Sequence, residues 1–212
     1  MPTLKKFSIT GAAGNLEGTA HLPDVQPRAI AVIAHPLPTM GGTMDNKVVT
    51  TLAKTFAELD FVALRFNFRG VGSSEGKFDN GDGETEDALA IVRHARQEYG
   101  DLPLILSGFS FGGYVQARVA QQCEPHRLVL IAPAVGRSVP SFKNSTGMPP
   151  VHNDTLLVHG ELDEVVPLAD VLEWARPLHL PIVVLPEAGH FFHGRLNQLK
   201  QIVLRAFNGQ PV

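Results

Sequence analysis

Short apolar runs that alternate with helical segments constrain the fold of this chain more than any other feature of its sequence. RAIAVIAHP, FVALRFNF and LPLILSG are apolar almost throughout, whereas NKVVTTLAKTFAEL and ETEDALAIVRHARQEYG place apolar residues at helical spacing. Strands of this kind, separated by helices, form mainly parallel sheets that are covered on both faces. The sequence therefore predicts an α/β fold from residue 28 onward.

The N-terminal segment has a different pattern. KKFSIT and LEGTAHLP are shorter and more alternating, and a turn separates them, which predicts an antiparallel hairpin at the sheet edge. The chain has 212 residues, 44% of them hydrophobic, with no internal repeat and no low-complexity linker. This length suits one hydrophobic core, so we expect residues 1–212 to form a single domain.

One glycine-rich stretch, ITGAAGNLEG at residues 9–18, suggests a nicotinamide cofactor. A dinucleotide site requires a buried strand before the glycines and a helix N-terminus after them. Here the glycines lead into TAHLPDVQP, which contains Pro23 and Pro27 and has no helical period. We therefore expect a hairpin turn at this position and no cofactor.

Charge and composition limit the partners. The formal net charge is −3 and no basic cluster occurs, which argues against nucleic acid or an anionic membrane as a partner. No window is apolar over membrane-spanning length, and the N-terminus lacks the apolar segment of a secretory leader. The single cysteine, Cys123, has no internal disulfide partner. We expect a cytoplasmic protein.

The stretch GFSFGG places Ser110 directly between an apolar strand and a helical pattern. It fits G-x-S-x-G in the strand–turn–helix setting of a nucleophile elbow. Gly108 and Gly112 would let the strand and the helix approach each other closely around a strained serine. The helix N-terminus would bring amide hydrogens and a positive dipole beside the hydroxyl. We therefore expect Ser110 to be a nucleophile.

A serine nucleophile needs a general base and an acid that orients this base. Asp163 follows the apolar run TLLVHG, and His190 follows the last one, PIVVLP. Because the carboxyl ends of parallel strands meet at one edge of the sheet, both residues should lie near Ser110.

Both residues have rivals in the sequence. Glu161 and Glu164 flank Asp163 and are alternative orienting acids or solvated loop charges. His193 lies three residues after His190, but no carboxylate or cysteine at ligand spacing accompanies the pair, so we expect no metal.

Two backbone amides are expected to hold the oxyanion of the reaction. One is the amide of Phe111, which follows the nucleophile, and the other belongs to the early loop AHPLPTMGGTMDNK. In that loop Pro36 and Pro38 have no N–H, so Leu37 between them is the candidate donor.

Taken together, these motifs resemble the α/β-hydrolase superfamily along nearly the whole chain. AHPLPTMGGTMDNKVV, LRFNFRGVGSSEG, GFSFGG, HGELDEVVP and EAGHFF are similar in kind and order to its small bacterial serine hydrolases without a lid. The chain departs from them at Leu37, where related sequences commonly have a histidine. The resemblance implies that Arg69 and Gly70 shape the loop beside the site, although Arg69 is equally well explained as a structural hydrogen-bonding residue.

The expected protein is an α/β-hydrolase fold without a lid domain that acts as a serine esterase on small, short-acyl esters. A thioesterase or another acyl hydrolase would use the same residues, and a non-catalytic binding or sensor protein on this fold is a further alternative. Residues 136–154 are too short for a helical lid, so the site should open to water. Its expected apolar walls are Leu37, Met40, Phe109, Phe111, Phe191 and Val166.

Overall fold

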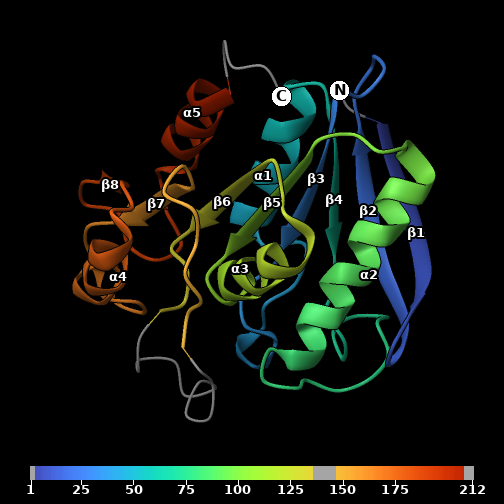
Figure 1. Ribbon diagram of the computed structural model, residues 1–212, viewed down its shortest axis with the longest axis horizontal. Coiled ribbons are helices and arrows are strands. Elements are labelled where there is room, and N and C mark those ends of the chain that lie inside the picture. Colours follow the sequence, from blue (N-terminus) through green and yellow to red (C-terminus); the bar gives the residue numbers. More distant parts are fainter. Residues whose placement is uncertain (1–2, 136–146, 208–212) are drawn as a thin grey trace.

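The protein is an α/β structure whose central sheet has eight strands (Figure 1). The structure, a computed structural model, describes residues 3–135 and 147–207. The strands are β1 (Thr3–Gly11), β2 (Gly14–Leu22), β3 (Ala29–Ala34), β4 (Phe61–Phe66), β5 (Leu104–Phe109), β6 (Arg127–Ile131), β7 (Leu156–Gly160) and β8 (Ile182–Leu185). The helices are α1 (Lys47–Glu58), α2 (Asp82–Tyr99), α3 (Phe111–Cys123), α4 (Leu168–Ala175) and α5 (Leu196–Phe207), with short 3₁₀ turns at Pro38–Met40 and Arg176–Leu178.

The strand order across the sheet is β1-β2-β4-β3-β5-β6-β7-β8, with β1 and β8 at opposite edges (Figure 1). The first two strands form an antiparallel hairpin, and β2 also pairs antiparallel with β4. Every other neighbouring pair, from β4–β3 to β7–β8, is parallel. This arrangement confirms the predicted mainly parallel sheet with an N-terminal hairpin at its edge.

Helices cover both faces of the sheet because its central strands are apolar on both sides (Figure 1). In β3, Ile30 and Val32 belong to the core on the side of α2, α3 and α4, whereas Ala31 and Ile33 face the core formed with α1 and α5. All four side chains are fully buried. The continuous apolar runs in the sequence thus correspond to strands that contribute alternately to two cores.

Local signals in the sequence set the beginning of α1. The Asn46 side chain caps this helix by accepting a hydrogen bond of 2.9 Å from the amide of Val48. The apolar residues of α1, including Leu52 and Phe56, then recur at helical spacing and face the sheet.

Two of the sequence expectations need separate comment. Of the segment 136–154, in which no lid was expected, residues 136–146 lie outside the described part of the chain. Among the described helices, none is both long enough and apolar enough to cross a lipid bilayer.

Candidate active site

The candidate site residues lie just beyond the carboxyl ends of four parallel strands. Leu37 follows β3, Ser110 follows β5, Asp163 follows β7 and His190 follows β8. These ends meet at one edge of a parallel sheet, which is where α/β proteins build their ligand sites. The topology therefore gathers side chains that are far apart in the sequence.

Ser110 has the strained backbone conformation of a nucleophile elbow. Its φ is 56° and its ψ is −119°, in the single position between the end of β5 and the start of α3. The two glycines around it are required by close packing. A Cβ on Gly108 would overlap the backbone of Gly112, and a Cβ on Gly112 would overlap the carbonyl oxygen of Ala34 in β3. The roles predicted for these glycines are confirmed.

Ser110, His190 and Asp163 are linked by hydrogen bonds in series. The Oγ of Ser110 lies 3.0 Å from Nε2 of His190, and Nδ1 of His190 lies 2.8 Å from Oδ2 of Asp163. All three residues are buried. With Nδ1–H donating to the carboxylate, Nε2 is free of a proton and can accept the one on Ser110.

The alternative acids, Glu161 and Glu164, and the alternative histidine, His193, contact other groups. Glu161 accepts a hydrogen bond of 2.9 Å from the amide of Glu187, and Glu164 lies 3.5 Å from the backbone amide of His190. Both carboxylates are on exposed residues, and the imidazole of His190 bonds to Asp163 instead. His193 is exposed, and its ring lies 5.9 Å from that of Phe191 in a tilted arrangement. Asp163 is therefore the acid that the structure brings to His190.

Asp163 is held as an anion despite its burial. Burial opposes ionisation, but hydrogen bonds and charge interactions with His190, together with the amide of Val166, lower the pKa of the carboxyl below its ordinary value. Its Oδ1 accepts from the amides of Val165 and Val166 at 2.9 and 2.8 Å. The carboxylate can thus stabilise a positive charge on His190 at neutral pH.

The loop after β3 presents the amide of Leu37 between two prolines. The carbonyl oxygen of Leu37 accepts hydrogen bonds from the amides of Met40 and Gly42, which closes the loop tightly. The Leu37 amide itself has no acceptor among the described residues. Phe111, the other expected donor, is the first residue of α3, so its amide belongs to the positive end of that helix.

His35 orients this loop and was missed by sequence reasoning. Its Nδ1–H donates to the carbonyl oxygen of Pro36 at 2.7 Å, and its Nε2 accepts from the amide of Phe68 at 3.1 Å. The Pro36 carbonyl and the Leu37 amide belong to the same peptide group, so the imidazole fixes the plane of the candidate oxyanion donor. Burial lowers the pKa of His35 to about 4, which keeps it neutral.

The apolar residues expected to wall the site fall into two groups. Met40 and Phe191 are 83% and 41% exposed and can contact a substrate from the open side. Phe109 and Val166 are completely buried, which differs from the expectation. The centre of the Phe109 ring lies 4.9 Å from that of the His190 imidazole, so this ring packs against the side chain of His190 inside the protein. Phe111 is likewise buried.

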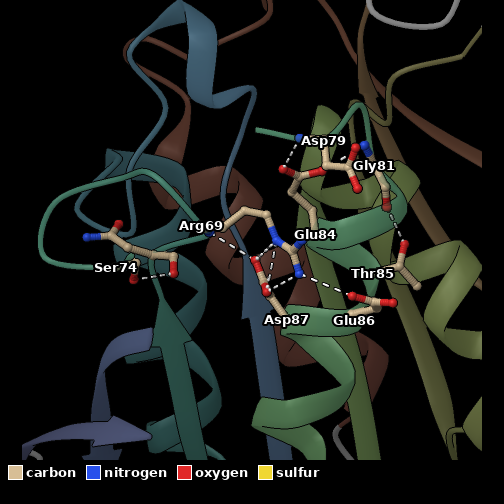
Figure 2. Close-up of polar contacts among 9 residues, drawn as sticks. Arg69, Ser74, Asp79, Gly81, Glu84, Thr85, Glu86 and Asp87 are labelled. Atoms are coloured by element: carbon tan, nitrogen blue, oxygen red, sulfur yellow. Dashed lines mark hydrogen bonds and ion pairs between the residues drawn. The ribbon is translucent and has the colours of Figure 1, made fainter. Parts of the chain in front are cut away.

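Arg69 has a structural environment. Its guanidinium forms hydrogen bonds to both carboxylate oxygens of Asp87 in α2, the shortest at 2.8 Å, and both side chains are buried (Figure 2). The Arg69 backbone amide also donates to Asp87. This pair anchors the loop after β4, and Phe68 and Phe78 of that loop pack on Phe111.

A second histidine, His159, lies beside Asp163 and was also missed. It is fully buried at the end of β7, with Nε2 3.3 Å from Oδ2 of Asp163. A sequence signal existed for both missed histidines, because His35 and His159 each occupy the end of an apolar strand that leads into a site loop. In the part of the chain that the structure describes, no cluster of three or more metal-ligating side chains occurs.

Comparison with known proteins gives consistent matches. The family described as serine aminopeptidase, S33, matches residues 25–153. An uncharacterised protein of Rickettsia prowazekii, RP471, is 31% identical over 210 residues, which cover 94% of this chain and 87% of that protein. The structure of an alpha-beta serine hydrolase homologue from Coxiella burnetii is 41% identical, with a TM-score of 0.85 and 98% of each chain covered. XC6422 from Xanthomonas campestris, described as a serine hydrolase without lid, is 36% identical, with a TM-score of 0.86, and the match covers 100% of this chain and 99% of that one.

These matches extend over the sheet, the elbow and the loops after β7 and β8, so they include every element that carries a candidate site residue. The similarity therefore concerns the whole architecture and not a single motif. The chain belongs to the serine aminopeptidase, S33, family of the α/β-hydrolase superfamily.

Proposed function

We propose that this hydrolase is a carboxylesterase-type enzyme that cleaves small, short-acyl esters through an acyl-enzyme on Ser110. The observation that carries the proposal is the hydrogen-bonded series from Ser110 through His190 to Asp163, at a strained turn between β5 and α3. An imidazole 3.0 Å from a serine hydroxyl is placed to remove its proton as the oxygen attacks.

In the first half of the reaction, Ser110 Oγ attacks the ester carbonyl and His190 Nε2 takes its proton. The negative charge on the former carbonyl oxygen is stabilised by the amides of Leu37 and Phe111. Collapse of this intermediate breaks the bond to the alcohol, which leaves with the proton from His190. In the second half, water loses a proton to His190 and attacks the acyl group. The bond to Ser110 then breaks, Oγ takes the proton from His190, and the carboxylic acid leaves.

The exposed apolar rim supports a preference for small acyl groups. Leu162 and Val165, on either side of Asp163, are 61% and 43% exposed, like Met40 and Phe191 on the neighbouring loops. Such a rim can cover a few methylenes, each contributing about 0.8 kcal/mol when buried. It does not enclose a long chain, so we propose acyl groups of about two to six carbons.

Peptide hydrolysis is the second candidate, because the family is named for serine aminopeptidases. Glu164 provides an exposed carboxylate beside His190 that an α-ammonium group can contact. A thioesterase would use the same nucleophile and base, and the geometry of the series is equally suited to it.

The test is a panel of substrates measured with the same enzyme preparation. We expect kcat/KM to be highest for p-nitrophenyl esters with short acyl chains and to show no increase on addition of micelles. Acyl-thioesters and amino-acid p-nitroanilides form the comparison arms, and a fluorophosphonate probe reports whether Ser110 is reactive. A maximum for lauroyl or palmitoyl esters would contradict the small-acyl preference. Faster cleavage of the anilides than of the esters would support peptidase activity in place of the proposed esterase activity. Absence of fluorophosphonate labelling would argue for a binding protein.

A further inference from the structure

We propose that His159 is a positioning residue for the catalytic acid, holding the Asp163 carboxylate in place and limiting how strongly it attracts the imidazolium of His190. This inference rests on the proposed function, because it assigns a role within the same hydrolytic machinery. It adds a fourth side chain, in close contact with Asp163, to the three of the series.

The position of His159 makes it part of the Asp163 turn. It lies in β7, four residues before Asp163, and its side chain is completely buried. Its Nε2 is 2.9 Å from the carbonyl oxygen of Val166 and 3.3 Å from Oδ2 of Asp163. The amide of Val166 in turn donates to Oδ1 of Asp163. One imidazole thus ties the backbone of this turn to β7 and lies in contact with its carboxylate.

The hydrogen-bond partners fix which nitrogen of His159 has the proton. A carbonyl oxygen can only accept, so Nε2 must be the donor to Val166. The same nitrogen also lies 3.3 Å from Oδ2 of the Asp163 carboxylate. The remaining nitrogen, Nδ1, is buried and has no hydrogen-bond partner among the described residues, as suits an unprotonated atom.

Burial keeps His159 neutral at the pH where the site operates. It is the largest influence and lowers the pKa of the imidazole; the Val166 carbonyl and the Asp163 carboxylate act in the opposite direction, and His190 adds to the lowering. A neutral imidazole beside Asp163 does not cancel the charge of the carboxylate. The acid therefore stays available to His190.

Asp163 accepts three hydrogen bonds and has His159 as a further close neighbour. The amides of Val165 and Val166 donate to Oδ1 and Nδ1–H of His190 donates to Oδ2, which also lies 3.3 Å from Nε2 of His159. The polar N–H of His159 beside Oδ2 reduces the negative charge that His190 experiences. Without His159, the two amides still bind Oδ1, but the Val166 carbonyl loses its donor and Oδ2 loses the neighbour that fixes its direction toward His190.

The experiment compares two substitutions of similar size that differ in donor capacity. His159→Gln retains an N–H close to the position of Nε2, and His159→Met has none. We expect His159→Met to lower kcat about tenfold with KM unchanged, which is within the cost of losing one buried hydrogen bond, here the one to the Val166 carbonyl. The acid limb of its kcat/KM–pH profile should move to higher pH by about 0.5. His159→Gln should restore most of kcat and the original acid limb.

Two controls separate this role from a purely structural one. His21→Met removes another buried imidazole, whose Nε2 accepts a hydrogen bond of 3.0 Å from Nε of Arg65 outside the site. This substitution should leave the acid limb of the kcat/KM–pH profile unchanged. Thermal unfolding of each variant measures stability independently of turnover. Fluorophosphonate labelling of His159→Met shows that the nucleophile remains present, so the proposed function can hold while this inference is tested.

An acid limb that stays in place or moves to lower pH in His159→Met would overturn the proposal. It would also fail if the Gln and Met variants had the same kcat, or if only the melting temperature changed. If His159→Met does not fold, His159→Leu, which also lacks a donor, takes its place, and an acid limb and kcat equal to those of His159→Gln would overturn the proposal.

Discussion

Two buried networks of titratable side chains, one inside the candidate site and one beside it, differ in what their protons can do. In one, Arg69 binds Asp87 through several hydrogen bonds, with Glu84 capping the adjoining turn (Figure 2). In the other, Asp163 binds His190 and lies beside His159. Both contain a fully buried carboxylate that receives side-chain and backbone donors.

The cation makes the difference. The guanidinium of Arg69 remains charged at every pH the protein meets, and hydrogen bonding to Asp87, partly opposed by burial, raises its pKa further. The imidazole of His190 can gain and lose a proton, and its second nitrogen faces a hydroxyl. A permanent charge pair can hold a loop, whereas an imidazole between a carboxylate and a serine can move a proton. Burial and a hydrogen-bonded carboxylate therefore do not identify a catalytic acid by themselves.

The largest expected effect is the loss of ester hydrolysis when the proposed nucleophile is removed. Ser110→Ala removes only the Oγ, so ester hydrolysis should fall by about 10³-fold or more while the structure remains intact. Initial rates on a short p-nitrophenyl ester and the far-UV CD spectrum measure the two properties. Near-wild-type turnover by the folded variant would remove Ser110 from the proposed mechanism.

A matched pair of Asp→Asn substitutions tests the comparison directly. Asp163→Asn should reduce kcat by about 10²- to 10⁴-fold, because the amide favours the wrong tautomer of His190 and withdraws stabilisation of its charge. Asp87→Asn leaves the buried Arg69 with weakened pairing and should cost about 3–5 kcal/mol of unfolding free energy. Urea unfolding and kinetics of both variants separate the roles. Equal effects of the two substitutions on kcat would contradict the distinction.

The smallest expected effect is that of buried histidines outside both networks on the pH dependence of the free energy of unfolding. His21 and His35 have pKa values lowered to about 4, chiefly by burial, whereas an unfolded histidine titrates near pH 6.5. Folding therefore disfavours protonation, so their contribution is complete above about pH 6.5 and is lost as the pH falls toward 4. Over this pH interval, the contribution of His35 alone to the free energy of unfolding changes by about 3 kcal/mol. Urea unfolding at several pH values measures the slope, and His21→Gln should flatten it. A flat profile from pH 7 to 4 would show that these imidazoles are solvated.

The sequence alone was sufficient to predict the fold class and the three residues of the series. Apolar runs alternating with helical periodicity are local signals, and they predicted the parallel sheet. The elbow GFSFGG and the residues after the last strands then predicted Ser110, Asp163 and His190, because parallel strands bring their carboxyl ends to one edge. The structure joins residues that are 27 and 80 positions apart in the sequence.

Only the tertiary structure decided which neighbours these residues have. Asp163 and not Glu161 or Glu164 reaches the imidazole, because the turn after β7 directs that one carboxylate inward. The burial of Phe109 and Val166, and the contacts of His35 and His159, depend on how loops from separate strands pack against one another. Periodicity specifies which face of an element is apolar, but the distance between two loop side chains is set by packing across the whole sheet.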